Sequence, residues 1–165
     1  MITCNVDEVV KQLQAYHEET VRSLKRMVTT FAYYVTLEAS RNTPVGDFDG
    51  NVSYQNLYKI REETYGIEAT PGFHAGAWRY SEQWNDAFFD PTIYTEEQAA
   101  IGVKQDVASK VQLGKKFYIR AMGPAYSLLD KGYSYKAPDG IVAPTLDTIA
   151  SVYSLNLANY YKGSQ

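Results

Sequence analysis

The sequence predicts an α+β fold with a long N-terminal helix, a small, mainly antiparallel sheet, one middle helix and a C-terminal helix. Three observations predict it. Residues 6–40 contain no glycine or proline, the stretch 117–122 combines aromatic and β-branched residues, and Pro144 precedes a last apolar repeat. A chain of 165 residues suits a single domain, which we assign to residues 1–165.

The first helix is predicted over residues 6–41. Asn5 is the expected N-cap, and Pro44 ends the helix because the residue before a proline is pushed out of the helical region. Such a helix is ~50 Å long, whereas a compact chain of this length is about 40 Å across. The helix therefore spans the domain or projects beyond it, unless a kink at residues 17–20 shortens it. Its apolar stripe, which needs cover from another subunit wherever it projects, comprises Val10, Leu13, Tyr16, Val21, Leu24, Val28, Phe31 and Val35.

A long irregular segment, residues 43–76, follows the first helix and is predicted to be a loop or insertion. A connection of this length inside a domain is typical of a functional loop.

The predicted core of sheet and helix occupies residues 77–142. It begins with a strand from Ala77 to Trp84, which Asp90-Pro91 closes.

The middle helix is predicted from about Glu96 to Lys110, because Thr95 and Gln98 match a capping box. The strand at residues 117–122 follows it. The C-terminal helix is predicted over residues 144–161. Its expected buried side comprises Leu146, Ile149, Val152, Tyr153, Leu157 and Tyr160.

Composition excludes several classes of protein. The net charge of −3 argues against DNA as the main partner, because nucleic-acid binders carry a basic face. The single cysteine, Cys4, builds neither a disulfide framework nor a thiolate metal site. Charged residues interrupt the first twenty positions, and no apolar run reaches the ~20 residues of a membrane helix. We expect a protein made in a reducing cytoplasm, without a membrane partner.

No motif predicts catalysis, a cofactor or a metal. The two histidines, His17 and His74, have no second histidine or cysteine ligand nearby in sequence. The segment 47–51 resembles the start of a calcium loop, but its glycine comes too early and Tyr58 stands where the loop needs a glutamate. Phosphate-binding glycine loops and the nucleophile elbow are absent from the sequence. We therefore expect a protein that is not an enzyme.

Tyrosine is unusually frequent, with fifteen residues. A tyrosine gives a large contact area with few rotatable bonds, so its enrichment favours a protein–protein interface. Coverage of a small core is the alternative explanation. The aromatic residues predicted to form an interface are Phe48, Tyr54, Tyr58, Tyr65, Phe73, Tyr133 and Tyr135.

Two stretches carry a resemblance to a known family. The first is Thr43-Pro44-Val45-Gly46 together with Gly76-Ala77-Trp78-Arg79-Tyr80-Ser81, separated by an insertion. The second comprises the strand at 117–120, Gly123-Pro124-Ala125-Tyr126, Gly132-x-Ser134 and Ala137-Pro138-x-Gly140, followed by the last helix. This order resembles the tail-completion, or head-to-tail joining, proteins of tailed bacteriophages. The matching motif residues are Thr43, Pro44, Gly76, Trp78, Arg79, Ser81, Tyr126, Gly132, Ser134, Pro138 and Gly140.

The resemblance implies a structural virion protein of the phage neck, assembled in the host cytoplasm. Such a protein is a ring subunit, expected in six copies, between head-side adaptor or portal proteins and the tail terminator or tail tube. It has no active site and no cofactor, and DNA is only a duplex passing through the channel. A tail terminator protein, a non-viral soluble protein-binding module and an enzyme with unrecognised chemistry are the alternatives.

Overall fold

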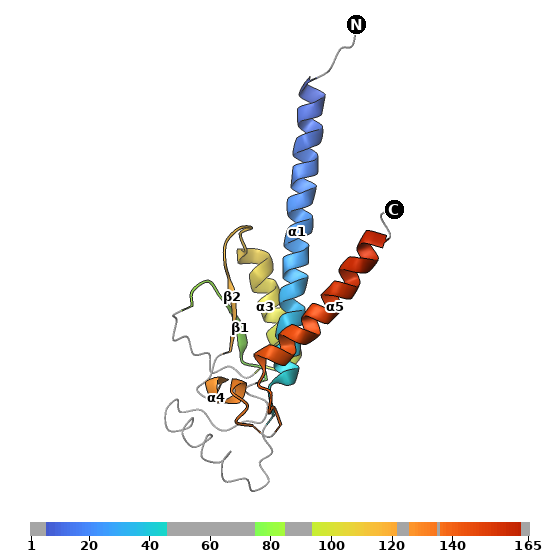
Figure 1. Ribbon diagram of the computed structural model, residues 1–165. Coiled ribbons are helices and arrows are strands. Elements are labelled where there is room, and N and C mark those ends of the chain that lie inside the picture. The colour runs from blue at the N-terminus through green and yellow to red at the C-terminus, as the bar shows by residue number, and fades with distance from the viewer. Residues whose placement is uncertain (1–5, 46–74, 85–93, 122–125, 135, 163–165) are drawn as a thin grey trace.

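The computed structural model describes residues 6–45, 75–84, 94–121, 126–134 and 136–162, and their side chains except those of residues 127–128 and 153–162 (Figure 1). Within these residues the fold is α+β, as predicted. In chain order the elements are α1 (Val6–Asn42), β1 (Trp78–Ser81), α3 (Glu96–Lys110), β2 (Tyr118–Ala121), α4 (Tyr126–Asp130) and α5 (Val142–Lys162).

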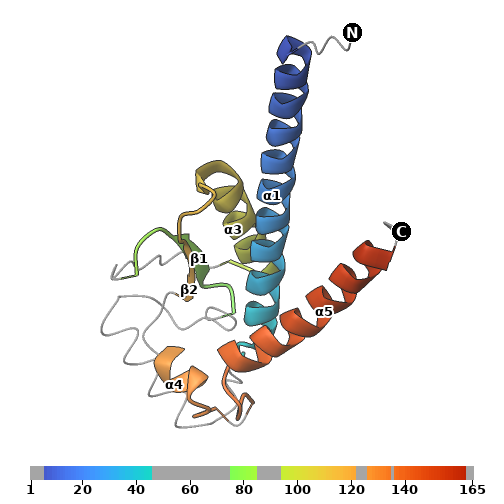
Figure 2. The same ribbon diagram turned by 45° about the horizontal axis from the view of Figure 1, so that its top comes forward.

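Helix α1 dominates the shape of the molecule. It runs unbroken for 37 residues, so the alternative of a break at residues 17–20 is wrong. Only its C-terminal half packs against the remaining elements, and its N-terminal half projects past them (Figures 1 and 2). The sequence left two alternatives, a helix that spans the domain and a helix that projects beyond it, and the described residues show the second.

The face of α1 that is buried differs from the predicted one. Its buried residues are small: Thr29, Ala32, Thr36, Ala39 and Ser40. The hydroxyl groups of Thr29 and Thr36 donate to the carbonyl oxygens four residues earlier, at 2.7 and 2.8 Å, so these polar groups are satisfied when buried. Small side chains let α3 and the sheet approach α1 closely. The large residues of the predicted stripe are instead exposed or only half-buried.

Helix α3 packs against the small-residue face of α1. Thr95 caps it as predicted: its hydroxyl accepts from the Gln98 backbone N–H at 3.2 Å, and the Gln98 side chain accepts from the Thr95 N–H at 2.9 Å. The valines of α3 then reach the buried alanine of α1. The resulting core cluster contains Ala32, Val103, Val107 and Val111, with Val28, Tyr80, Phe117 and Ile119 packed around it.

The sheet has two short antiparallel strands. Trp78 pairs with Ala121 and Ser81 with Tyr118. Both strands are shorter than the sequence predicts. Through Trp78 the sheet joins a second core cluster near the C-terminal end of α1, which contains Ala39, Trp78, Leu129 and Ile141.

Helix α5 begins two residues earlier than predicted, at Val142. Its start is fixed by Asp130, whose carboxylate accepts hydrogen bonds from the backbone N–H groups of Ile141 and Val142 at 3.1 and 2.8 Å. The predicted buried side is partly wrong. Ile149 is buried, but Leu146 and Val152 are exposed. Helix α5 diverges from α1 towards its C-terminal end (Figure 2). The side chains of Tyr153, Leu157 and Tyr160 lie outside the described ones.

Candidate functional site

The two halves of the sequence motif meet at the C-terminal end of α1. The indole N–H of Trp78 donates to the hydroxyl of Thr43 at 3.2 Å, although 35 positions separate them. The ring of Tyr126 meets the Trp78 ring edge to face, with centroids 5.4 Å apart. Trp78 is 7% exposed and Thr43 is 2% exposed. We call Thr43, Gly76, Trp78, Arg79 and Tyr126 the motif cluster.

Arg79 holds the backbone that enters β1. Its guanidinium group donates to the carbonyl oxygens of Gly76 at 2.6 Å and Trp78 at 2.9 Å, and it lies 4.1 Å from the centroid of the Tyr94 ring. Gly76 is packed against the Tyr94 backbone so closely that a Cβ atom would overlap the Tyr94 carbonyl oxygen. These contacts give Arg79 a positioning role.

The loop after α4 completes this end of the molecule. Gly132 and Gly140 have positive φ angles of 77° and 78°, which side-chain-bearing residues rarely adopt. A Cβ atom at Gly132 would overlap the carbonyl oxygen of Pro138, and one at Gly140 would overlap that of Asp130. Ser134, which is buried, forms an isolated bridge with Ala137. The glycines of this motif are therefore required by close backbone approach.

The remaining motif residues lie around the cluster at different distances. Pro44 and Pro138 line one open hollow of about 410 Å³ beside the end of α1, where the Lys136 ammonium group donates to the Val45 carbonyl at 3.0 Å. Ser81 lies at the opposite end of β1 and hydrogen-bonds the Gln83 backbone, so the structure does not bring it to the cluster.

The motif cluster also changes the pKa of one of its own side chains, that of Tyr126. Burial raises the pKa of the Tyr126 phenol far above its ordinary value, and this effect outweighs the nearby Arg79 charge and the hydrogen bond with Thr43, which both lower the pKa. Although part of the Tyr126 residue stays accessible, its phenol lies within the cluster. A phenol that keeps its proton in this way is a structural group rather than an acid or base at neutral pH.

Of the predicted interface residues, only Tyr133 lies within the described part of the chain. It is 76% exposed, as a docking residue must be before it meets its partner. Phe48, Tyr54, Tyr58, Tyr65, Phe73 and Tyr135 lie outside the described residues.

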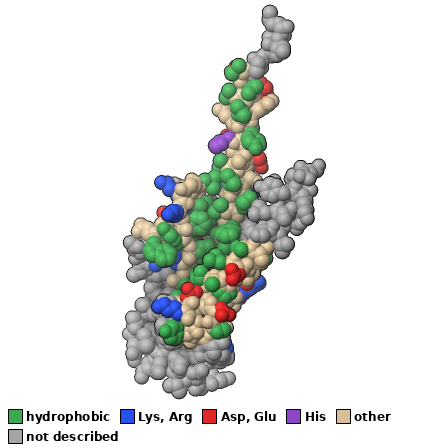
Figure 3. All heavy atoms as spheres, viewed as in Figure 1, with side chains coloured by type: hydrophobic (Ala, Val, Ile, Leu, Met, Phe, Trp, Pro, Cys, Tyr) green, Lys and Arg blue, Asp and Glu red, His purple; other side chains and the backbone are tan. Residues whose placement is uncertain are grey.

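The exposed apolar surface of α1 shares Val10, Leu13, Tyr16, Leu24 and Phe31 with the apolar stripe that the sequence predicts, and the expected cover by another subunit stays a prediction. Leu13 is 63% exposed and Tyr16 is 74% exposed. Apolar side chains mark the projecting part of α1 (Figure 3). The exposed large side chains of this surface, which we call the α1 stripe, are Val6, Val9, Val10, Leu13, Tyr16, Leu24, Met27, Phe31 and Tyr34.

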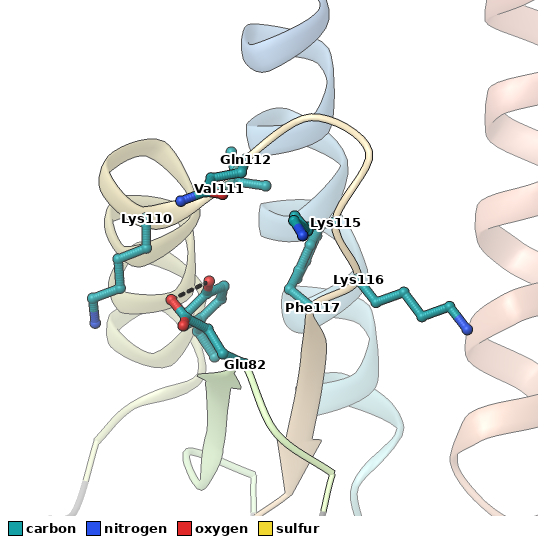
Figure 4. A pocket seen from close by; sticks show the side chains of 8 residues that line it. Glu82, Lys110, Val111, Gln112, Lys115, Lys116 and Phe117 are labelled. Carbon is teal, nitrogen blue, oxygen red and sulfur yellow. Dashed lines mark hydrogen bonds between the residues drawn. The ribbon is translucent and has the colours of Figure 1, made fainter.

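A hollow of about 290 Å³ lies between the end of α3 and the start of β2 (Figure 4). Lys110 and Lys116 at its rim extend in different directions, and Lys110 is already paired with Asp106 at 2.6 Å. The Tyr80 hydroxyl donates to the Glu82 carboxylate at 3.1 Å (Figure 4). These groups do not converge on a point where a substrate atom could react.

Within the described residues, no group of three or more histidine, cysteine, aspartate or glutamate side chains is placed to hold a metal ion. Likewise, none of the helices in that part of the chain combines the length and apolar character needed to cross a membrane.

Comparison with known proteins yields no match to a family model, to a curated protein or to a solved structure. The functional interpretation therefore depends on the motif cluster and on the exposed surfaces.

Proposed function

We propose that this chain is a structural protein of a tailed-phage virion, a ring subunit of the neck that joins the head-side connector to the tail. It acts by presenting surfaces to neighbouring subunits, and it converts no substrate. Its partners are other copies of itself, the head-side adaptor or portal proteins, and the tail terminator or tail tube protein.

The observation that best supports this function is the hydrogen bond between Trp78 and Thr43. In the sequence, an insertion separates the two halves of the tail-completion motif. In the fold, residues of both halves form the motif cluster around the buried Trp78 and Thr43, and Gly132 and Gly140 of the second stretch are held by close backbone contacts. A motif whose residues mainly pack together and fix the backbone suits a protein that works through its shape.

The exposed surfaces support the same function. The projecting α1 stripe and the exposed Tyr133 offer apolar and aromatic contact area on separate parts of one subunit. A subunit that closes a ring needs two different contact surfaces for its neighbours, and a joining protein needs further ones for its partners above and below. The side chains around the hollow in Figure 4, in contrast, do not form a reaction site.

The function is tested by inactivating this gene in the phage that encodes it. We expect DNA-filled heads and tails of normal length that remain unjoined, and joining should return when the chain is supplied from a plasmid. Tails of abnormal length would indicate a tail terminator instead. A normal yield of infectious particles would refute a role in virion assembly.

A further inference from the structure

Seven residues of the α1 stripe have the spacing of a coiled-coil seam, and the other two, Val9 and Tyr16, flank it. Residues 6, 10, 13, 17, 20, 24, 27, 31 and 34 follow one another in alternating steps of four and three, which is the heptad period. Every large apolar residue in this series is 38–65% exposed. His17 and Thr20 interrupt the series in its middle. The buried face of α1, in contrast, uses other positions, which are occupied by small residues. Large apolar residues occupy seven of these nine positions, and such a heptad seam indicates that the partner is another helix.

The charges on α1 are segregated along its length. Residues 6–19 carry four acidic side chains, Asp7, Glu8, Glu18 and Glu19, and one basic side chain, Lys11. Residues 20–33 carry three basic side chains, Arg22, Lys25 and Arg26, and no acidic one. Two parallel copies of α1 would therefore place like charges side by side. Two antiparallel copies would place the acidic half of each helix along the basic half of the other.

We propose that the α1 stripe binds the α1 stripe of a second copy of this chain, in antiparallel orientation about a two-fold axis at Arg22. The heptad limits the register to steps of seven residues, because in an antiparallel coiled coil each a position of one helix packs on a d position of the other. Among these registers, the one centred on Arg22 brings Glu18 and Glu19 alongside Lys25 and Arg26 of the second copy. The layers that follow are Val10 on Tyr34, Leu13 on Phe31, His17 on Met27 and Thr20 on Leu24, each occurring twice.

The same register agrees with the charges. Glu18 lies on the flank that carries Lys25 of the second copy, and Glu19 lies on the flank that carries its Arg26. These side chains point partly outward, so their attraction acts over roughly a Debye length and selects the orientation more than it adds affinity. Arg22 points away from the seam and is paired with Glu19 of its own chain at 3.1 Å.

The size of the surface is sufficient for a stable pair. The nine large side chains of the α1 stripe are about half exposed. If each loses roughly 80 Å², two copies together bury about 1,400 Å², which is the area of a standard specific interface. The stripe spans ~42 Å of helix from residue 6 to residue 34.

This pairing does not depend on a location in the virion. A two-fold contact closes on itself and cannot extend into a ring. The pair is therefore the form of the free protein, and entry into a ring requires α1 to exchange the second copy for a ring neighbour. Absence of the chain from virions would refute the neck function and leave the pair intact.

The orientation is tested by disulfide trapping in a Cys4→Ser background. His17→Cys and Met27→Cys are made on separate chains, since both side chains are exposed. Oxidation of the mixed chains should give mainly the 17–27 cross-link. Cross-links that join 17 to 17 and 27 to 27 would overturn the antiparallel arrangement.

The surface is tested by sedimentation equilibrium of the full chain. We expect a mass of two copies, and we expect Leu13→Arg to raise the dissociation constant by about 100-fold or more because it places a charge in the seam. The matched control is Ala15→Arg, an exposed residue of the same helix that faces away from the seam, and it should leave the dissociation constant within a few-fold. A monomer at every concentration, or equal effects of both substitutions, would overturn the proposal.

Discussion

At the scale of single residues, Trp78 is the side chain on which the motif cluster depends. It shares a core cluster with Ala39 of α1, donates to Thr43 directly after that helix, meets Tyr126 of α4, and belongs to β1. Three elements that are distant in sequence are therefore fixed by one indole ring.

We expect Trp78→Ala to lower the free energy of unfolding by about 3–5 kcal/mol, the cost of emptying a buried aromatic site. Trp84→Ala is the matched control, because Trp84 is 68% exposed; its cost should stay below about 1 kcal/mol. Urea unfolding of both variants provides the comparison. Equal losses would show that Trp78 does not anchor the core.

Gly132 gives a second residue-scale prediction. Gly132→Ala should cost about 2 kcal/mol or more, because it combines a positive φ with a Cβ atom that overlaps the Pro138 carbonyl. Gly114 also has a positive φ, of 84°, but a Cβ atom there meets open space. Gly114→Ala should therefore cost only about 1 kcal/mol. Thermal unfolding of the two variants side by side gives the comparison. Equal losses of stability would contradict this explanation.

Tyr126 is expected to make the free energy of unfolding depend on pH in the alkaline range. Burial raises the pKa of its phenol in the folded state, so the associated stability is fully present below the unfolded pKa of about 10 and is lost as the pH rises above it. Between pH 9 and 11 we expect the free energy of unfolding to fall by about 1.4 kcal/mol more in the native protein than in Tyr126→Phe. Tyr133→Phe removes an exposed phenol and serves as control. Identical pH slopes in the native protein and Tyr126→Phe would contradict this account.

At the scale of elements, the sequence predicted where α1 and α3 begin and end, but it did not predict which face of α1 is buried. The absence of glycine and proline from residues 6–40 and the Thr95–Gln98 capping box are local signals, and α1 and α3 follow them closely. The buried face of α1 depends on which element packs against it. Large apolar residues suggested one face, but α3 packs on the small residues around Ala32. The start of α5 was also missed, since its cap comes from Asp130, eleven positions before Ile141.

Which face of α1 is buried can be tested by enlarging a side chain on that face. Ala32→Leu inserts a large side chain where α1 and α3 are in close contact, and we expect it to cost about 1–3 kcal/mol through overpacking. Ala15→Leu makes the same change on an exposed position of the same helix and should change stability by less than about 0.5 kcal/mol. Chemical denaturation distinguishes the two. A neutral Ala32→Leu would mean that the small-residue face is not the packed one.

At the scale of the whole molecule, a small body carries a helix that projects beyond it (Figure 1). The length of an uninterrupted helix, compared with the width of a compact chain, predicted a helix that either spans the domain or projects beyond it. The sequence also located the motif residues, but not the Thr43–Trp78 contact that joins them, because 35 positions lie between the two. Contacts of this kind depend on tertiary packing, which no local pattern encodes.

The insertion gives the molecule-scale prediction. Shortening residues 47–72 should leave the unfolding transition intact, because the Thr43–Trp78 bond and both core clusters lie outside that range. Particle completion should fail, because the segment carries the aromatic residues expected to dock. The two readouts are thermal unfolding of the purified variant and infectious yield. Normal yield would show that the insertion has no docking role.

The most direct measurement for the central claim, that this chain is a structural part of a virion neck, is its localisation in purified infectious particles by electron microscopy with a bound antibody. We expect label at the junction of head and tail, on intact virions. Virions that lack the chain, or label elsewhere on the particle, would contradict the claim.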